Sequence, residues 1–157
     1  MKRRQLFFSV YAAILLYFLL FGRSAENYAL FSAEYWQMLP ERMNLVPFRT
    51  VGILLNAARV YWQQYQSAYY IRFAIINLGG NVLLFLPLGI FLPMLWQKQR
   101  KFWRFLLTVV GMVCAVEVLQ LVLALGSLDV DDLLLNTIGA MLGFAVWKIC
   151  HRTAPKP

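Results

Sequence analysis

The chain has 157 residues, of which 61% are hydrophobic and 14% are charged. An ordinary soluble domain is about 45–50% apolar and about 25% charged, so the composition excludes that class and predicts an integral membrane protein with one membrane domain. The net charge of +8 comes from basic residues at the ends of apolar runs, without a continuous basic stripe, so we expect it to set membrane topology and not to bind nucleic acid.

The first apolar run covers residues 5–21, directly behind the basic sequence MKRR. It is similar to a signal peptide, but Arg23 would lie three residues before a cleavage after Ala25, where a small residue is needed. We therefore expect an uncleaved signal anchor, which is a membrane-spanning helix that begins on the cytoplasmic side.

A long segment, residues 22–71, follows this anchor on the outer side. Within it, SAENYALFSAEYWQML and VGILLNAARVYWQQYQSAYY carry aromatic and apolar residues at roughly helical spacing, and Pro40 and Pro47 break the chain between them. Trp and Tyr are favoured at the membrane–water interface, so we expect one or two amphipathic helices that lie in the outer interface. A soluble loop domain is the alternative, but the segment has little polar surface for it.

Three further apolar runs can cross a bilayer, for which a helix needs about 20 residues, although the last of them is slightly short. They cover residues 72–96, 103–125 and 133–148. In the last run, Gly139 and Gly143 form a GxxxG pattern, which predicts close helix packing. The fold class is therefore an all-α membrane protein with about four transmembrane helices, a single domain over residues 1–150 and a polar tail over residues 151–157.

Positive charges predict how these helices are oriented. With the N-terminus in the cytoplasm, ten of the fifteen basic residues lie on the inner side, and most of the outer ones lie in the long segment, where charge counts less. The inner residues are Lys2, Arg3, Arg4, Lys98, Arg100, Lys101, Arg104, Lys148, Arg152 and Lys156. We therefore expect a multi-pass protein with both termini in the cytoplasm.

In this topology, polar side chains of three helices fall at a similar depth, just below the outer surface. Spacings of three or four residues place them on shared helical faces. They are Asn77 and Asn81 in the second span, Glu117 and Gln120 in the third, and Asp129, Asp132 and Asn136 in the fourth. Asp131 points to another side, where we expect it to meet water and the helix dipole. An ionisable group inside a span costs about 2.5 kcal/mol or more, so Glu117 should face the bundle and line a polar cavity open to the outer face.

Structural interpretations compete with this cavity. Asp129 could be the N-cap of the last helix with Asp132 in its first turn, since the helix dipole favours acids there. The amides could simply form hydrogen bonds between helices. Glu117 is the member that packing alone explains least well.

The cluster is compatible with several kinds of chemistry. Carboxylates at Glu117, Asp129 and Asp132 could hold a divalent cation such as Mg²⁺ or Ca²⁺, which prefers oxygen ligands, and no other cofactor is implied. Glu117 and Asp132 could also act as an acid–base pair. However, the single histidine, His151, lies in the polar tail, and no nucleophile stands out. We therefore favour binding over catalysis.

Four stretches follow one another in a characteristic order and spacing. They are NLVPFR (44–49), NVLLFLPLGIFLP (81–93), VEVLQ (116–120) and DVDDLLLNTIGAMLG (129–143). In this order the chain resembles the VanZ-like family over residues 1–150. These are small bacterial membrane proteins named after an accessory determinant of resistance to teicoplanin, a lipoglycopeptide antibiotic. The resemblance implies a location in the bacterial cytoplasmic membrane.

The resemblance also implies which residues bind a ligand. The positions that match the polar residues of the family's motifs are Asn44, Arg49, Asn81, Glu117, Gln120, Asp129, Asp132 and Asn136. The family commonly has an Arg three residues before the first Asp of the acidic motif, whereas this chain has Gly126 there. Arg49 could replace that cation if NLVPFR folds over the site.

Three functions remain open at this point. We expect a non-enzymatic protein that binds an amphiphile at the outer face, such as a lipoglycopeptide or a lipid-linked envelope precursor, with a role in glycopeptide resistance or envelope homeostasis. The alternatives are an enzyme that acts on an envelope lipid through Glu117 and Asp132, and a structural subunit whose polar groups only lock helices together. Membrane lipids are the expected partners, and a homo-oligomer is compatible with the sequence.

Overall fold

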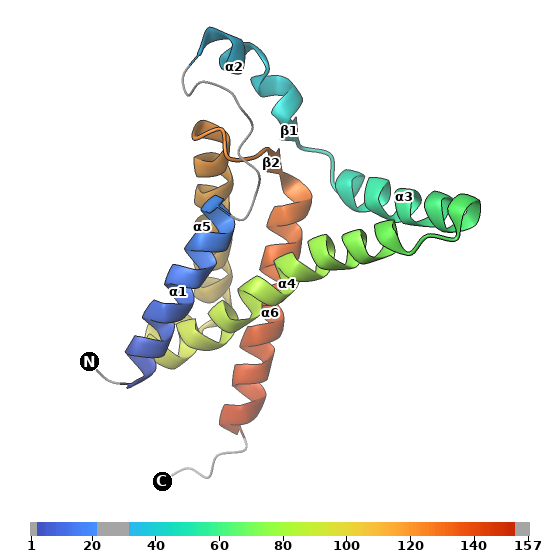
Figure 1. Cartoon of the computed structure of the whole chain (residues 1–157). Coiled ribbons are helices and arrows are strands. Elements are labelled where there is room, and N and C mark those ends of the chain that lie inside the picture. Colours follow the sequence, from blue (N-terminus) through green and yellow to red (C-terminus); the bar gives the residue numbers. More distant parts are fainter. Residues whose placement is uncertain (1–2, 22–31, 153–157) are drawn as a thin grey trace.

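The computed structural model describes residues 3–21 and 32–152, and helices make up most of it (Figure 1). In chain order the elements are α1 (Arg3–Phe21), α2 (Ala33–Gln37), the 3₁₀ helix η1 (Leu39–Arg42), β1 (Met43–Asn44), α3 (Arg49–Tyr65), α4 (Tyr69–Leu95), the 3₁₀ helix η2 (Gln97–Arg100), α5 (Phe102–Val122), β2 (Leu128–Asp129) and α6 (Val130–Arg152). Within the described residues, α4, α5 and α6 are long and apolar enough to cross a membrane. The first predicted span coincides with α1, and four as the number of spans stays a prediction.

The last helix is longer than the sequence indicates. The apolar run predicts a span over 133–148, but α6 includes Val130 and continues through His151, which was expected in the polar tail. His151 contacts the carbonyl of Trp147 with its ring nitrogen at 2.9 Å, one turn back along the helix. With 23 residues, α6 is about 35 Å long, enough for a hydrocarbon core of about 30 Å. The rest of the predicted tail, residues 153–157, lies outside the described residues.

The closest helix packing joins α4 to α6. A Cβ atom on Gly139 or Gly143 would overlap the backbone carbonyl of Val82 or Leu86, and a Cβ atom on Gly89 would overlap the backbone of α6. Small residues allow helix backbones to approach each other in this way. The predicted role of the GxxxG pattern in close packing is therefore confirmed.

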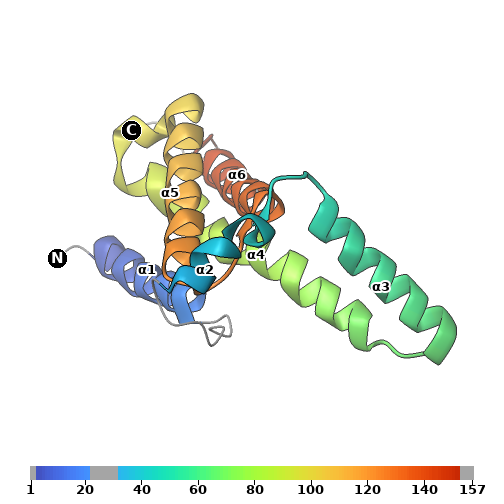
Figure 2. The ribbon, with the colours of Figure 1, turned by 90° about the horizontal axis from the view of Figure 1, so that it is seen from above.

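The molecule divides into a bundle and an arm. The bundle consists of α1, α5, α6 and the C-terminal half of α4, around a core that includes Phe85, Leu88, Phe105, Val109, Val113 and Phe144. The N-terminal half of α4 leaves the bundle and packs against α3. We call α3 and this half of α4, residues 49–80, the arm. Figure 2 shows that it points away from α1 and α5.

Both described ends of the chain lie at the same end of the bundle as the connection between α4 and α5, in the lower half of Figure 1. That connection carries Lys98, Arg100 and Lys101. This arrangement agrees with two termini on one side of a membrane. That this side is the cytoplasm stays a prediction from the distribution of charge.

The segment between α1 and α4 differs from the prediction in its first half. Residues 22–31 lie outside the described residues, and the first predicted amphipathic helix is described only as the short α-helix α2 and the start of η1. Ser32 accepts a hydrogen bond from the Tyr35 backbone N–H at 3.2 Å and caps α2. Pro40 has no N–H to continue the α-helix, so the chain turns into η1. The second predicted amphipathic helix is confirmed as α3, which ends where Gln66 adopts a left-handed conformation.

Candidate functional site

A short parallel strand pair joins the segment before α3 to the segment before α6. Met43 pairs with Leu128, and Asn44 pairs with Asp129. Asn44 and Asp129 are 85 positions apart in the sequence, so the NLVPFR and DVDD stretches meet only in the folded chain. Two residues per strand are too few for an alternating pattern, which is why the sequence does not predict this pair.

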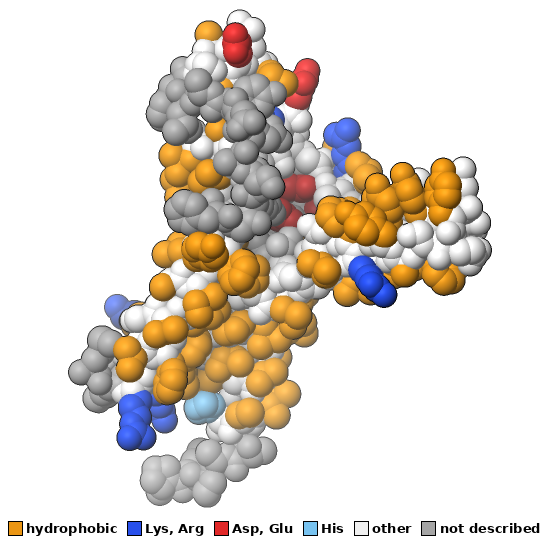
Figure 3. Space-filling model, in the orientation of Figure 1, with side chains coloured by type: hydrophobic (Ala, Val, Ile, Leu, Met, Phe, Trp, Pro, Cys, Tyr) orange, Lys and Arg blue, Asp and Glu red, His pale blue; other side chains and the backbone are white. Residues whose placement is uncertain are grey.

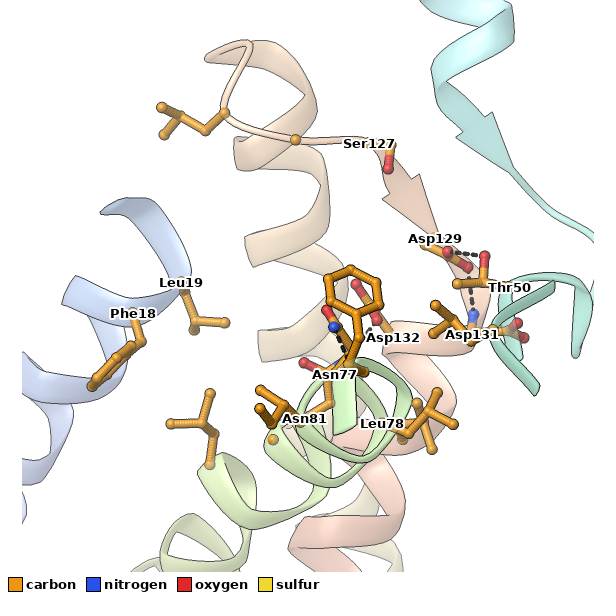
Figure 4. Close-up of a pocket in the computed structure, with 18 of the residues that line it drawn as sticks. Phe18, Leu19, Thr50, Asn77, Leu78, Asn81, Ser127, Asp129, Asp131 and Asp132 are labelled. Carbon is orange, nitrogen blue, oxygen red and sulfur yellow. Dashed lines mark hydrogen bonds between the residues drawn. The ribbon is translucent and has the colours of Figure 1, made fainter. Parts of the chain in front are cut away.

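Asp129 is a helix cap and a tertiary link at the same time. One carboxylate oxygen accepts hydrogen bonds from the Asp131 backbone N–H at 2.9 Å and from the Asn44 side-chain amide at 3.0 Å. The other oxygen accepts from the Thr50 hydroxyl at 2.5 Å (Figure 4). The cap interpretation of Asp129 is therefore confirmed. Because both oxygens are engaged by the protein, the carboxylate also holds the start of the arm against α6.

The prediction that Asp131 meets water is wrong. Its side chain is fully buried, with 0% exposure. Its two carboxylate oxygens accept hydrogen bonds from the backbone N–H groups of Phe48 at 2.5 Å and Val51 at 3.1 Å. Phe48 precedes α3 and has no side-chain acceptor of its own for a cap, so a carboxylate from α6 caps α3 and meets the positive end of its dipole. Helical spacing predicts that Asp131 faces away from the bundle, but it does not predict that the start of α3 covers this side of α6.

Asp132 connects α6 to α4 as the shared polar face predicts. The Asn81 side-chain amide donates to one Asp132 carboxylate oxygen at 2.5 Å. Figure 4 shows both residues in the lining of a cavity between α1, the arm and the start of α6. Asn77, one turn before Asn81, donates instead to the Phe73 carbonyl of its own helix at 2.7 Å.

Three predicted residues, Glu117, Gln120 and Asn136, are buried and are not among the described residues that line the cavity between α1, the arm and α6. Glu117 is 4% exposed and accepts from the Asp129 backbone N–H at 3.2 Å, so it faces the bundle as expected. Gln120 donates to the Leu19 carbonyl at 2.5 Å and ties α5 to α1. Asn136 is 2% exposed, and its side-chain oxygen has no hydrogen-bond partner among the residues that the structure describes.

A cavity of about 1160 Å³ lies between α1, the arm and the start of α6. It exceeds the usual range of about 300–1,000 Å³ for pockets that hold a drug-sized molecule. Its polar lining consists of Glu41, Arg42, Thr50, Asn77, Asn81, Ser127, Asp129, Asp131 and Asp132. Its apolar lining includes Phe18, Leu19, Phe73, Ile76, Leu83 and Leu84. Figure 3 shows acidic side chains in the recess between the arm and the rest of the molecule. A cavity lined by both polar and apolar side chains suits an amphiphile.

Arg42 is a cavity residue that the sequence alone did not single out. Its guanidinium donates to the Gly126 carbonyl at 3.5 Å and lies 5.3 Å from the centre of the Tyr35 ring. Tyr35 is buried, and its hydroxyl donates to the Leu121 carbonyl. Burial raises the pKa of Tyr35 above its usual value, so the hydroxyl stays protonated and keeps donating.

The structure thus brings a cation to Gly126, but from a different residue than the sequence suggested. Arg49 is exposed at the start of α3 and is not among the described lining residues. Arg42 directly precedes β1, and the pairing of β1 with β2 carries it to the segment before Asp129. Only the register of this long-range pair distinguishes the two arginines.

The carboxylates do not converge as a metal site. Across residues 3–21 and 32–152, no group of three His, Cys, Asp or Glu side chains has a metal-binding arrangement. Asp129 turns toward Asn44 and Thr50, and Asp132 toward Asn81. The divalent cation on Glu117, Asp129 and Asp132 therefore stays a prediction without a geometry to support it.

Comparisons with known proteins agree with the sequence motifs. The sequence model of a family described as VanZ/LLP1 matches residues 8–151. Protein VanZ of Enterococcus faecium is 26% identical to this chain over 72 residues, which are 46% of this chain and 44% of that protein. The match thus spans less than half the length of that relative. No solved structure matches the chain.

Proposed function

The chain belongs to the VanZ/LLP1 family, and we propose that this membrane protein binds an amphiphile in the cavity between α1, the arm and α6. The ligand is a lipoglycopeptide such as teicoplanin, or an envelope lipid or lipid-linked precursor, taken from the outer face of the bacterial cytoplasmic membrane. The protein would serve glycopeptide resistance or envelope homeostasis. The observation that carries the proposal is the cavity of about 1160 Å³, which is lined by both polar and apolar side chains.

The polar and the apolar lining residues support different parts of an amphiphile. Asn81 and Asp132 offer an amide and a carboxylate to a polar headgroup. Phe73, Ile76 and Leu83, on the arm and just beyond it, offer an apolar surface to an acyl chain. These groups lie at the end of α6 away from the basic α4–α5 connection, which the charge rule assigns to the cytoplasm. An outward-facing cavity follows from that assignment.

The structural alternative has specific support for two of the acids. Asp129 and Asp131 use both of their carboxylate oxygens on donors of the protein itself. We therefore assign these two residues to the scaffold of the cavity. Asp132 lines the cavity beside Asn81, and we assign it to the ligand.

Binding to the purified full-length protein in detergent tests this function. Teicoplanin and a fluorescent phosphatidylglycerol serve as probes in separate titrations. Wild type should bind at least one of them saturably, and Asp132→Asn should weaken that binding about tenfold, because hydrogen bonds to a charged group contribute roughly 1.5–3 kcal/mol. Glu34→Gln is the matched control. It removes the same charge as Asp132→Asn, but from an exposed residue on α2 that is not among the described lining residues.

Two results contradict the proposal. Absence of saturable binding of both probes removes the binding function altogether. Chromatography of the recovered lipid distinguishes the enzymatic alternative: a product formed by wild type and lost in Glu117→Gln and Asp132→Asn would replace binding with turnover.

A further inference from the structure

The polar lining of the cavity includes one positive group and several negative ones. Within the described lining residues, Arg42 is the one basic side chain, and Glu41, Asp129, Asp131 and Asp132 are acidic. A wall of this composition discriminates between ligands by the charge of each part of the headgroup. The charges of the lining residues therefore indicate the chemical class of the ligand.

The guanidinium of Arg42 is held in place from two sides. The Tyr35 ring lies 5.3 Å from it, and the Gly126 carbonyl accepts from it at 3.5 Å. Tyr35 is itself anchored, since it is buried and its hydroxyl donates to the Leu121 carbonyl. A guanidinium offers a planar fork of N–H donors that matches a phosphate or a carboxylate. Because its position is set before binding, little entropy is lost when an anion arrives.

The acidic lining residues differ in their hydrogen-bond partners. The oxygens of Asp129 accept from Asn44, Thr50 and the Asp131 backbone N–H, and those of Asp131 accept from the start of α3. These donors stabilise the negative charges within the scaffold. Asp132 accepts from Asn81 and lines the cavity, and a carboxylate has about four lone-pair sites, so it can accept from several donors at once, including a hydroxyl or an ammonium group of a ligand.

We propose that the cavity recognises a phospholipid whose headgroup combines a phosphodiester with an N–H or O–H donor. Arg42 binds the phosphodiester, Asp132 accepts from the donor, and the acyl chains lie against the wall formed by residues such as Phe18, Ile76 and Leu83. The proposal rests on the proposed function and commits it to a lipid headgroup. A lipoglycopeptide is then an alternative outcome of the test.

Four lipids with identical acyl chains separate the two recognition elements. Phosphatidylethanolamine and phosphatidylglycerol carry both the phosphodiester and a donor. Phosphatidylcholine keeps the phosphodiester but has no N–H or O–H donor on its headgroup, and diacylglycerol keeps a hydroxyl but has no phosphate. Native mass spectrometry of the full-length protein in detergent yields an apparent Kd for each. We expect the first two lipids to bind about tenfold more tightly than the other two.

Variants assign each element to its residue. Arg42→Gln should weaken phosphatidylethanolamine and phosphatidylglycerol about tenfold and leave diacylglycerol unchanged, and Arg42→Lys should fall between Arg42→Gln and wild type. Asp132→Asn should abolish the preference for these two lipids over phosphatidylcholine. Arg59→Gln is the matched control, because Arg59 is exposed on α3 and is not among the described lining residues.

The outcomes separate this inference from the proposed function. Equal affinity of wild type for all four lipids, or unchanged preferences in Arg42→Gln, overturns the headgroup assignment while binding of amphiphiles stands. Binding of teicoplanin without binding of any lipid does the same. If neither lipid nor drug binds, the proposed function fails as well. The wild-type preferences decide even if Arg42→Gln does not fold, since they need no variant.

Discussion

The crossing of α4 with α6 and the attachment of the arm are held together by opposite means. At the crossing, glycines let two backbones touch, and no side chain could be added without displacing a helix. At the arm, carboxylates of Asp129 and Asp131 bind donors near the start of α3. The first contact depends on shape, and the second depends on a few charged hydrogen bonds. The comparison indicates that the helix crossing is sensitive to added side-chain volume, while the attachment of the arm depends on single carboxylates.

The largest effect is expected at the helix crossing. Gly139→Ala places a methyl group on the Val82 carbonyl, so α4 and α6 must separate, and we expect a loss of about 3 kcal/mol or more in the free energy of unfolding. Unfolding in mixed detergent micelles measures it. Gly111→Ala is the matched control, because a Cβ atom there would meet no other segment of the described structure within 4 Å. Equal stability of the two variants would show that the crossing is not close-packed.

A smaller effect, confined to the arm, is expected at the acidic segment. Asp131→Ala removes the acceptor of the Phe48 and Val51 backbone N–H groups, and a lost cap with buried donors costs about 2 kcal/mol. Hydrogen exchange should accelerate at residues 48–52 and stay slow at the α4–α6 crossing. Glu34→Ala serves as the control, since it removes an exposed acid. Uniform acceleration through the bundle would contradict the division into two regions.

The smallest effect is expected between α1 and α5. Gln120→Leu removes the hydrogen bond to the Leu19 carbonyl but keeps an apolar side chain of similar size. Hydrogen bonds between membrane helices average about 0.6 kcal/mol, so we expect a loss of that order in the same unfolding measurement. If Gln120→Leu lowered the free energy of unfolding as much as Gly139→Ala does, the loss of one hydrogen bond would not explain the effect, and the prediction would be wrong.

Much of the fold follows from local features of the sequence. The apolar runs predict the positions of α1, α4, α5 and α6 because the cost of burying polar groups acts on each segment separately. The orientation of Glu117 toward the bundle follows from the same cost. Spacings of three and four residues place Asn81 and Asp132 on faces that meet. Each of these predictions uses the residue pattern of a single helix and no contact between distant segments.

The site contains residues that no local pattern reveals. Arg42 lies on the cavity only because β1 pairs with β2 in one register, and a shift of that register would remove it from Gly126. Asp131 is buried only because the start of α3 covers it. The pattern of α6 by itself leaves Asp131 facing outward, which is why the prediction for this residue is wrong.

The amino-acid sequence by itself was sufficient to identify the chain as a membrane protein, to locate its apolar helices and the packing face of α6, and to assign the family. These properties depend on hydropathy, helical period and short motifs, which are properties of neighbouring residues. The tertiary structure alone decided which acids serve as caps, which arginine lines the cavity and which polar and apolar side chains meet around it. Those properties depend on contacts such as that between Asn44 and Asp129, 85 positions apart, which form only when the whole chain has folded.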